Sequence, residues 1–148
     1  MKKTLLATTF SLAALTLAAL PAAAESQKKL ITILTAPEPQ TQLMAMVLTM
    51  NAVAKGAEAQ VLLCGPAADI ALKDAPESAT AGQAPKGASP QGLLKMMIEK
   101  QNVKAEVCAI YLPGKGADAS VLMNGVTAAK PDVMGAELIA DDTTVMSF

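Results

Sequence analysis

Apolar runs and stretches with helical spacing alternate along the chain from about residue 28 onward. The β-branched run at 30–34 ends before two prolines, which predicts a buried strand that leads into a turn. From 40 to 55 apolar residues recur on one helical stripe, and Gly56 stands where a helix would end. A second buried strand is predicted at 59–64, where Gly65 and Pro66 interrupt it.

The second half of the mature chain continues this alternation. We predict a short helix at 67–72, a helix at 92–101, a strand at 103–110, helical turns at 117–123, a short strand at 125–128, a helix at 131–140 and a closing strand at 143–148. Alternating strands and helices predict an α/β protein, with three α/β/α layers around a mainly parallel sheet of about five strands. Residues 25–148 are expected to form a single domain.

The segment at about 73–92 differs from its surroundings, because prolines, glycines and small polar residues replace large apolar ones. Such a segment has little apolar surface to offset the entropy lost on ordering. We therefore predict a flexible loop, which is either functional or disordered.

The first 24 residues predict a signal peptide. Lys2 and Lys3 precede an apolar run that ends at Pro21, and small residues then lead to a cleavage site after Ala24. A membrane anchor is the alternative, but the run is shorter than the roughly 20 residues that a spanning helix needs. We expect a periplasmic protein without a membrane span after cleavage.

Composition excludes several function classes. The chain has a net charge of −1, no arginine and few aromatic residues, so nucleic acid is not an expected partner. It has no histidine, which removes imidazole-based triads, histidine acid–base catalysis and histidine-containing zinc sites. Met44, Met46 and Met50 could suggest copper, but their helical spacing favours core packing, with Met44 at a subunit contact. No metal or cofactor is expected.

Cys108 is the main candidate for chemistry. It lies near the carboxyl end of the alternating strand predicted at 103–110, where open parallel sheets place ligands. Lys115 could stabilise its thiolate, and the amides of Gly114 and Gly116, before an expected helix start, could hold an anion. A buried inert cysteine and a plain surface turn are the alternatives for these two features.

The order of segments resembles the DsrE/DsrF-like family of sulfur-relay proteins. KKLITILTAPEPQTQ is similar to the family's first strand and turn, AVAKGAEAQVLLCGPAADIAL to its helix–glycine–strand segment, VKAEVCAIYLPGKG to its cysteine strand, and DDTTVMSF to its last strand. The resemblance implies that Cys108 carries sulfane sulfur as a persulfide and that the protein forms trimers or hexamers. Lys115-Gly116 stands where the family commonly has Arg-Gly.

Two functions from different classes follow. The first is a periplasmic sulfur carrier or sulfurtransferase-like protein, which exchanges sulfur with a partner protein or a small sulfane compound. The second is a non-catalytic oligomeric binding or assembly module in which Cys108 is structural. The sequence does not decide whether the protein is an enzyme.

Cys64 is a candidate resolving thiol for Cys108. If the second and third strands are neighbours, a strand spacing of about 4.8 Å could bring both Cα atoms within reach of a disulfide. If the first strand lies between them, a bridge would require backbone movement. Because the domain is long enough to fold without a covalent staple, we predict free thiols in the resting protein.

Overall fold

A computed structural model describes residues 27–148, so the expected signal peptide lies outside the described residues. Strands and helices alternate as the sequence predicts. In chain order the elements are β1 (Lys29–Leu34), α1 (Pro39–Ala54), β2 (Glu58–Leu63), the 3₁₀ helix η1 (Gly65–Ala71), α2 (Glu77–Thr80), α3 (Pro90–Gln101), β3 (Lys104–Val107), α4 (Tyr111–Lys115), the 3₁₀ helix η2 (Ala119–Val121), β4 (Val126–Ala128), α5 (Pro131–Leu138) and β5 (Thr143–Ser147).

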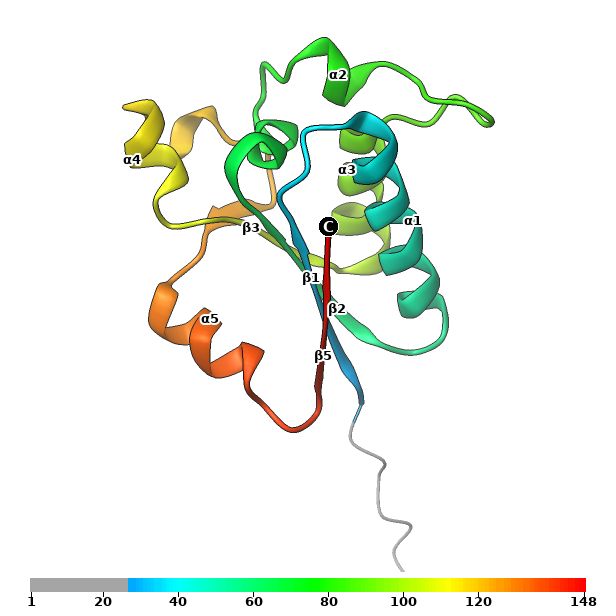
Figure 1. Cartoon of the computed structure of the whole chain (residues 1–148), viewed down its shortest axis with the longest axis vertical. Helices are drawn as coiled ribbons and strands as arrows, with labels where there is room; N and C mark the ends of the chain where they lie inside the picture. The colour runs from blue at the N-terminus through cyan, green and yellow to red at the C-terminus, as the bar shows by residue number, and fades with distance from the viewer. Residues whose placement is uncertain (1–26) are drawn as a thin grey trace, which may run out of the picture.

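The five strands form one sheet in the order β4-β3-β2-β1-β5, and every neighbouring pair is parallel. α1 and α3 cover one face of the sheet and α5 lies on the other (Figure 1). The predicted three-layer α/β/α fold is therefore confirmed. Because all strands run the same way, their carboxyl ends lie along one edge of the sheet.

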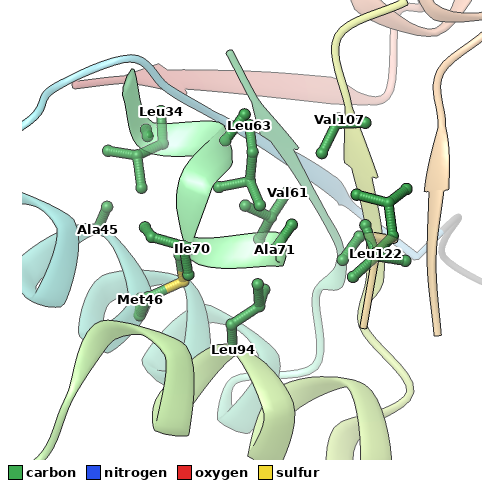
Figure 2. Packing of buried hydrophobic residues seen from close by; sticks show 14 of the residues in the cluster. Leu34, Ala45, Met46, Val61, Leu63, Ile70, Ala71, Leu94, Val107 and Leu122 are labelled. Carbon is green, nitrogen blue, oxygen red and sulfur yellow. The ribbon is translucent and has the colours of Figure 1, made fainter. Parts of the chain in front are cut away.

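The main core lies between the sheet and the pair α1 and α3. Figure 2 shows Met46 of α1 and Leu94 of α3 close to Ile70 of η1 and the strand residues Val61 and Leu63. All five side chains are fully buried. Met46 thus packs in the core as predicted from its helical spacing, whereas Met44 on the same helix is 51% exposed.

The opposite face of the sheet is covered by α5. Met134 of this helix packs on Ile31 and Leu62, and Cys64 and Cys108 border the same apolar cluster. Alternation along the third strand predicts that Glu106 faces solvent, but α5 covers that face and Glu106 is only 7% exposed. The polar face of a strand is buried here because a helix crosses it.

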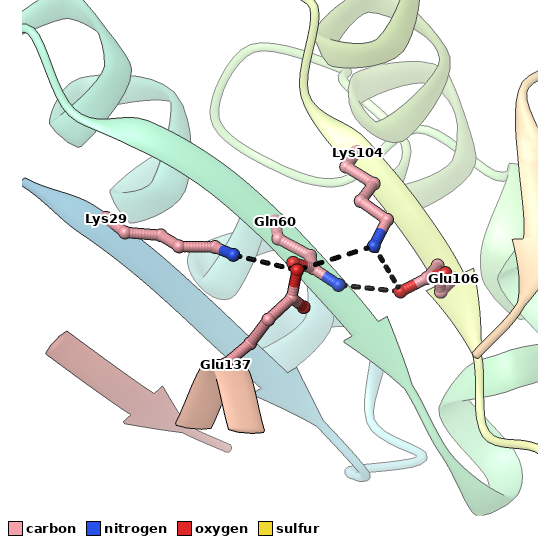
Figure 3. Close-up of polar contacts among 5 residues, drawn as sticks. All are labelled: Lys29, Gln60, Lys104, Glu106 and Glu137. Carbon is pink, nitrogen blue, oxygen red and sulfur yellow. Dashed lines mark hydrogen bonds and ion pairs between the residues drawn. The ribbon is translucent and has the colours of Figure 1, made fainter. Parts of the chain in front are cut away.

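A group of charged and polar side chains lies at the amino end of this face (Figure 3). Glu137 of α5 pairs with Lys29 at 2.9 Å and with Lys104 at 3.8 Å. Lys104 also pairs with Glu106 at 3.1 Å, and the amide of Gln60 donates to Glu106 at 2.6 Å. These contacts connect α5 to three strands, which fixes the helix over the sheet.

The segment at 73–92 contains more regular structure than predicted. It includes α2, an isolated bridge between Gln83 and Ala88, and the first turn of α3. α3 begins at Pro90 because Ser89 accepts a hydrogen bond from the Gly92 amide and caps the helix. Flexibility of this segment stays a prediction.

Candidate functional site

Cys64 and Cys108 directly follow the neighbouring strands β2 and β3. Leu63 pairs with Val107 in the ladder, and the Cys108 amide donates to the Leu63 carbonyl at 2.8 Å. The two Cα atoms lie 5.1 Å apart, and the cysteines form a disulfide. The prediction of free thiols is therefore wrong, because the strand order places the two chain positions side by side rather than on either side of β1.

The disulfide lies in an open cavity of about 480 Å³ at the carboxyl edge of the sheet. Both cysteines are half-buried. Side chains from the two segments that follow β2 and β3 form the rest of the wall, chiefly Pro66, Asp69, Ile110, Tyr111 and Lys115. The disulfide is thus placed where a small molecule or a partner's side chain can approach it.

Asp69 is the centre of a small polar cluster in this cavity. Its Oδ1 accepts from the Tyr111 hydroxyl at 2.6 Å and from Lys115 Nζ at 2.8 Å. Lys115 Nζ also lies 5.4 Å from the centroid of the Tyr111 ring, so its charge faces the ring as well. The three side chains hold one another in fixed positions beside the cysteines.

The cluster perturbs the acidity of two of its members. Partial burial acts to raise the pKa of Asp69, but the hydrogen bonds from Lys115 and Tyr111 and the Lys115 charge outweigh it, leaving the pKa below its ordinary value. Burial, followed by the hydrogen bond to Asp69 and its negative charge, raises the pKa of Tyr111 far above its ordinary value. Asp69 is therefore an anion and Tyr111 a neutral hydrogen-bond donor at neutral pH.

Short helices place these side chains. η1 begins directly after Cys64 and carries Asp69, whereas α4 begins three residues after Cys108 and carries Tyr111 and Lys115. α4 ends at Gly116, whose φ of +64° is the left-handed conformation that glycine adopts readily. The third strand is shorter than predicted, because the backbone turns into α4 instead of extending to Ile110.

The expected anion site at Gly114 and Gly116 is not present in this geometry. Both residues lie at the carboxyl end of α4 rather than before a helix start. Their amides donate to the carbonyls of Ile110 and Pro113, both at 3.0 Å, so neither is free to bind an anion. The positive charge of the site comes from the side chain of Lys115.

The structure brings together Cys64, Cys108 and Lys115, which the sequence analysis singled out. It pairs Lys115 with Asp69, a residue that sequence reasoning missed together with Tyr111. A signal was present in the spacing, because Asp69 lies five residues after Cys64 and Tyr111 three after Cys108. Polar residues shortly after adjacent strand ends tend to meet at one edge of a parallel sheet.

A second, larger cavity lies over α1. This groove has a volume of about 820 Å³ and runs between α1, the turn at 83–88 and the chain end. Its apolar wall consists of Leu43, Met44, Val47, Met50, Leu93 and Phe148. Within residues 27–148 no cluster of three or more metal-ligating side chains is found, and no helix is long and apolar enough to cross a membrane.

Comparison with known proteins identifies the fold. No protein-family model and no curated protein sequence matches the chain. Among solved structures, the YchN protein of E. coli is 20% identical with a TM-score of 0.59, over 82% of this chain and 99% of YchN. MTH1491 of Methanobacterium thermoautotrophicum, a protein of unknown function, is 14% identical with a TM-score of 0.60, over 83% of this chain and 100% of MTH1491. The chain therefore shares the fold of these two proteins over 82% and 83% of its length.

Proposed function

We propose that this protein is an exported sulfur carrier in which Cys108 holds sulfane sulfur as a persulfide and Cys64 resolves it. The observation that supports the proposal is the pairing of both cysteines in an open cavity at the carboxyl edge of the sheet. A dithiol placed in this way can alternate between a disulfide and a loaded state. The fold shared with DsrE/YchN-like proteins is consistent with sulfur-relay chemistry.

Loading begins with reduction of the disulfide. A dithiol reductant supplies two electrons and two protons, which gives thiols at Cys64 and Cys108. The Cys108 thiolate then attacks the outer sulfur of a sulfane donor, forms a new S–S bond and displaces the rest of the donor as its leaving anion. Lys115, although paired with Asp69, adds positive charge to the same cavity and favours the thiolate.

Release uses the second cysteine. The Cys64 thiolate attacks Sγ of the Cys108 persulfide, the S–S bond of the persulfide breaks, and hydrosulfide leaves. The Cys64–Cys108 disulfide re-forms, so the two electrons that opened it leave with the sulfide. Alternatively, an acceptor thiolate takes the outer sulfur directly and leaves Cys108 reduced.

The disulfide also supports the proposed periplasmic location. Disulfides persist in oxidising compartments and are rare in the cytosol, and the first 24 residues have the pattern of an export signal. Sulfur donors and acceptors would then be periplasmic proteins or small sulfane compounds.

A second candidate function is a non-catalytic binding or assembly module with a structural disulfide. The apolar groove over α1 favours it, because a wall with Met44 and Phe148 is suited to an apolar partner. Met44 and Leu48 are 51% and 41% exposed, and a homo-trimer or hexamer that covers them is part of either proposal. Light scattering at micromolar concentration tests that assembly.

Intact mass measurement separates the two functions. The mature protein is reduced, freed of reductant and incubated with inorganic polysulfide, alongside Cys64→Ser and Cys108→Ser variants. The carrier gains about 32 Da, the mass of one sulfur atom, unless Cys108 is replaced. Because Cys64 can release the sulfur again in wild type, Cys64→Ser is the variant that should retain the added mass. If neither early wild-type samples nor Cys64→Ser gains it, or if Cys108→Ser gains it equally, the carrier function is wrong and the binding module stands.

A further inference from the structure

The two opposite charges of the disulfide cavity partly offset each other. Asp69 and Lys115 are the charged residues that line it, and they pair at 2.8 Å. A lone lysine beside a cysteine would attract anionic substrates, whereas a lysine neutralised by a carboxylate attracts them much less. This charge balance bears on which sulfur donors can load Cys108.

We propose that Asp69 sets the donor specificity of the cavity, so that Cys108 is loaded by sulfane donors of low charge with an apolar group rather than by the thiosulfate dianion. This inference rests on the proposed sulfur-carrier function and names its substrate class. Asp69 is a specificity-determining residue here, because its charge acts on the donor through the cavity and no bond to the reacting sulfur is required.

The position of Asp69 supports this role. Its carboxylate is held by Tyr111 and Lys115, so it cannot turn away from the cavity when an anion enters. The carboxylate acts on both of its partners. Without it, the positive charge of Lys115 would not be balanced, and the Tyr111 hydroxyl would lose a charged acceptor. The carboxylate therefore keeps the lysine from binding a doubly charged donor.

The apolar part of the wall accounts for the preferred donor group. Ile110 is 80% exposed next to the disulfide, and Pro66 and the Tyr111 ring face the same space. A large side chain exposed to this degree provides contact area for an apolar ligand. An aromatic or alkyl group can pack on Ile110 while its sulfane sulfur reaches Cys108.

Thiosulfate and benzenethiosulfonate form a matched pair of donors for a test. With thiosulfate, the Cys108 thiolate and one proton give the persulfide and sulfite. With benzenethiosulfonate, the same step gives the persulfide and benzenesulfinate. The S–S bond that forms and the S–S bond that breaks are of the same kind, but the second donor has one negative charge fewer and an apolar ring.

The experiment measures loading rates of reduced full-length mature protein with each donor. Asp69→Asn keeps an oxygen that can accept from Tyr111 but removes the negative charge, and Lys115→Gln makes the opposite change. Asp74→Asn is the matched control, since Asp74 is an exposed carboxylate outside the cavity. Because the Asp69–Lys115 pair is partly exposed, these variants are expected to fold, which circular dichroism checks.

We expect the thiosulfate rate to rise on the order of fivefold in Asp69→Asn and to fall in Lys115→Gln, both effects shrinking in added salt. The benzenethiosulfonate rate should rise less than the thiosulfate rate in Asp69→Asn. In Lys115→Gln it should fall with the loss of the charge that favours the thiolate, but less than the thiosulfate rate falls, and Asp74→Asn should resemble wild type. If both donors load every variant with an unchanged rate ratio, Asp69 does not set specificity and only this inference is wrong. If neither donor loads any variant, the carrier function itself is wrong.

Discussion

The sheet has a polar region at each end, and the two regions differ in the burial of their carboxylates rather than in residue type. At the amino end, Glu137 of α5 contacts Lys29 and Lys104, and Glu106 contacts Lys104 and Gln60 (Figure 3). At the carboxyl end, Asp69 and Lys115 line an open cavity with the disulfide. Both regions contain lysine–carboxylate pairs, yet only one of them can meet a ligand.

Burial decides what each pair does. Glu106 has a side chain 9% exposed and accepts from both Lys104 and Gln60, so its loss would leave the buried amide of Gln60 without this acceptor. The Asp69 and Lys115 side chains are 32% and 42% exposed, where solvent screens the pair and its net stabilisation is small. The amino end therefore holds the fold together, and the carboxyl end is available for chemistry.

The largest expected effect on stability is the loss of the disulfide. It closes a loop between residues 44 apart in sequence, and such a cross-link stabilises by about 4 kcal/mol through the entropy of the unfolded chain. Urea unfolding of the wild-type protein with and without reductant measures the difference, and a Cys64→Ser, Cys108→Ser double variant should not respond to reductant. If reductant lowers the unfolding free energy of both proteins equally, the disulfide is not the source of the effect.

Replacing a carboxylate by the corresponding amide should lower the free energy of unfolding by different amounts in the two polar regions. Glu106→Gln weakens a buried charged hydrogen bond and is expected to cost about 2 kcal/mol, whereas Asp69→Asn should cost less than about 1 kcal/mol. Urea unfolding free energies at pH 7 give both values. A larger loss of unfolding free energy in Asp69→Asn than in Glu106→Gln would contradict this difference between the two regions.

Glu137 should make the amino-end region sensitive to acid. Burial acts to raise its pKa, but the hydrogen bond from Lys29 and the charges of Lys104 and Lys29 prevail and hold the pKa below its ordinary value of 4.5. A depressed folded-state pKa gives stability that is fully present above pH 4.5 and is lost as pH falls through the folded-state value.

The measurement is the unfolding free energy between about pH 6 and pH 3 for wild type and Glu137→Gln. The wild-type protein should lose more stability across this window than the variant, and the two curves should converge at the acidic end. If the unfolding free energies of the two proteins run parallel with pH, the folded state does not favour the charged form of Glu137.

The smallest expected effect concerns the segment at 73–92, which lies apart from both regions. Its only helix before α3 spans four residues, and its turn is closed by the isolated bridge between Gln83 and Ala88. We expect faster amide exchange at 74–88 than in α1 or α3. If the amides at 74–88 exchange as slowly as those of α1, the prediction of flexibility is wrong.

The sequence predicted the layers well but the sites only in part. Apolar runs and helical stripes identified β1, β2, α1 and α5 nearly to their ends, because burial on a sheet or helix face imposes a fixed spacing. The disulfide was not predicted, because it depends on strand order, and spacing along the chain does not contain that information. The sequence therefore left both strand orders open.

Two other misses have local causes. The sequence predicted a strand to Ile110 and helical turns only from 117, but α4 begins at Tyr111, so Tyr111 and Lys115 come from a helix. Glu106 alternates like a solvent-facing residue, and its burial arises from α5, which is distant in sequence. Tertiary contacts changed the meaning of these local patterns.

A single-turnover experiment tests most directly whether Cys64 and Cys108 alternate between persulfide and disulfide. Reduced protein is mixed with equimolar benzenethiosulfonate, and intact mass and free sulfide are followed together. The account predicts that wild type gains about 32 Da, then returns to the disulfide mass while releasing equimolar sulfide. Cys64→Ser should keep the added sulfur, and Cys108→Ser should gain none. Persulfide that forms on Cys64 instead, or sulfide release that persists in Cys108→Ser, would contradict the central claim.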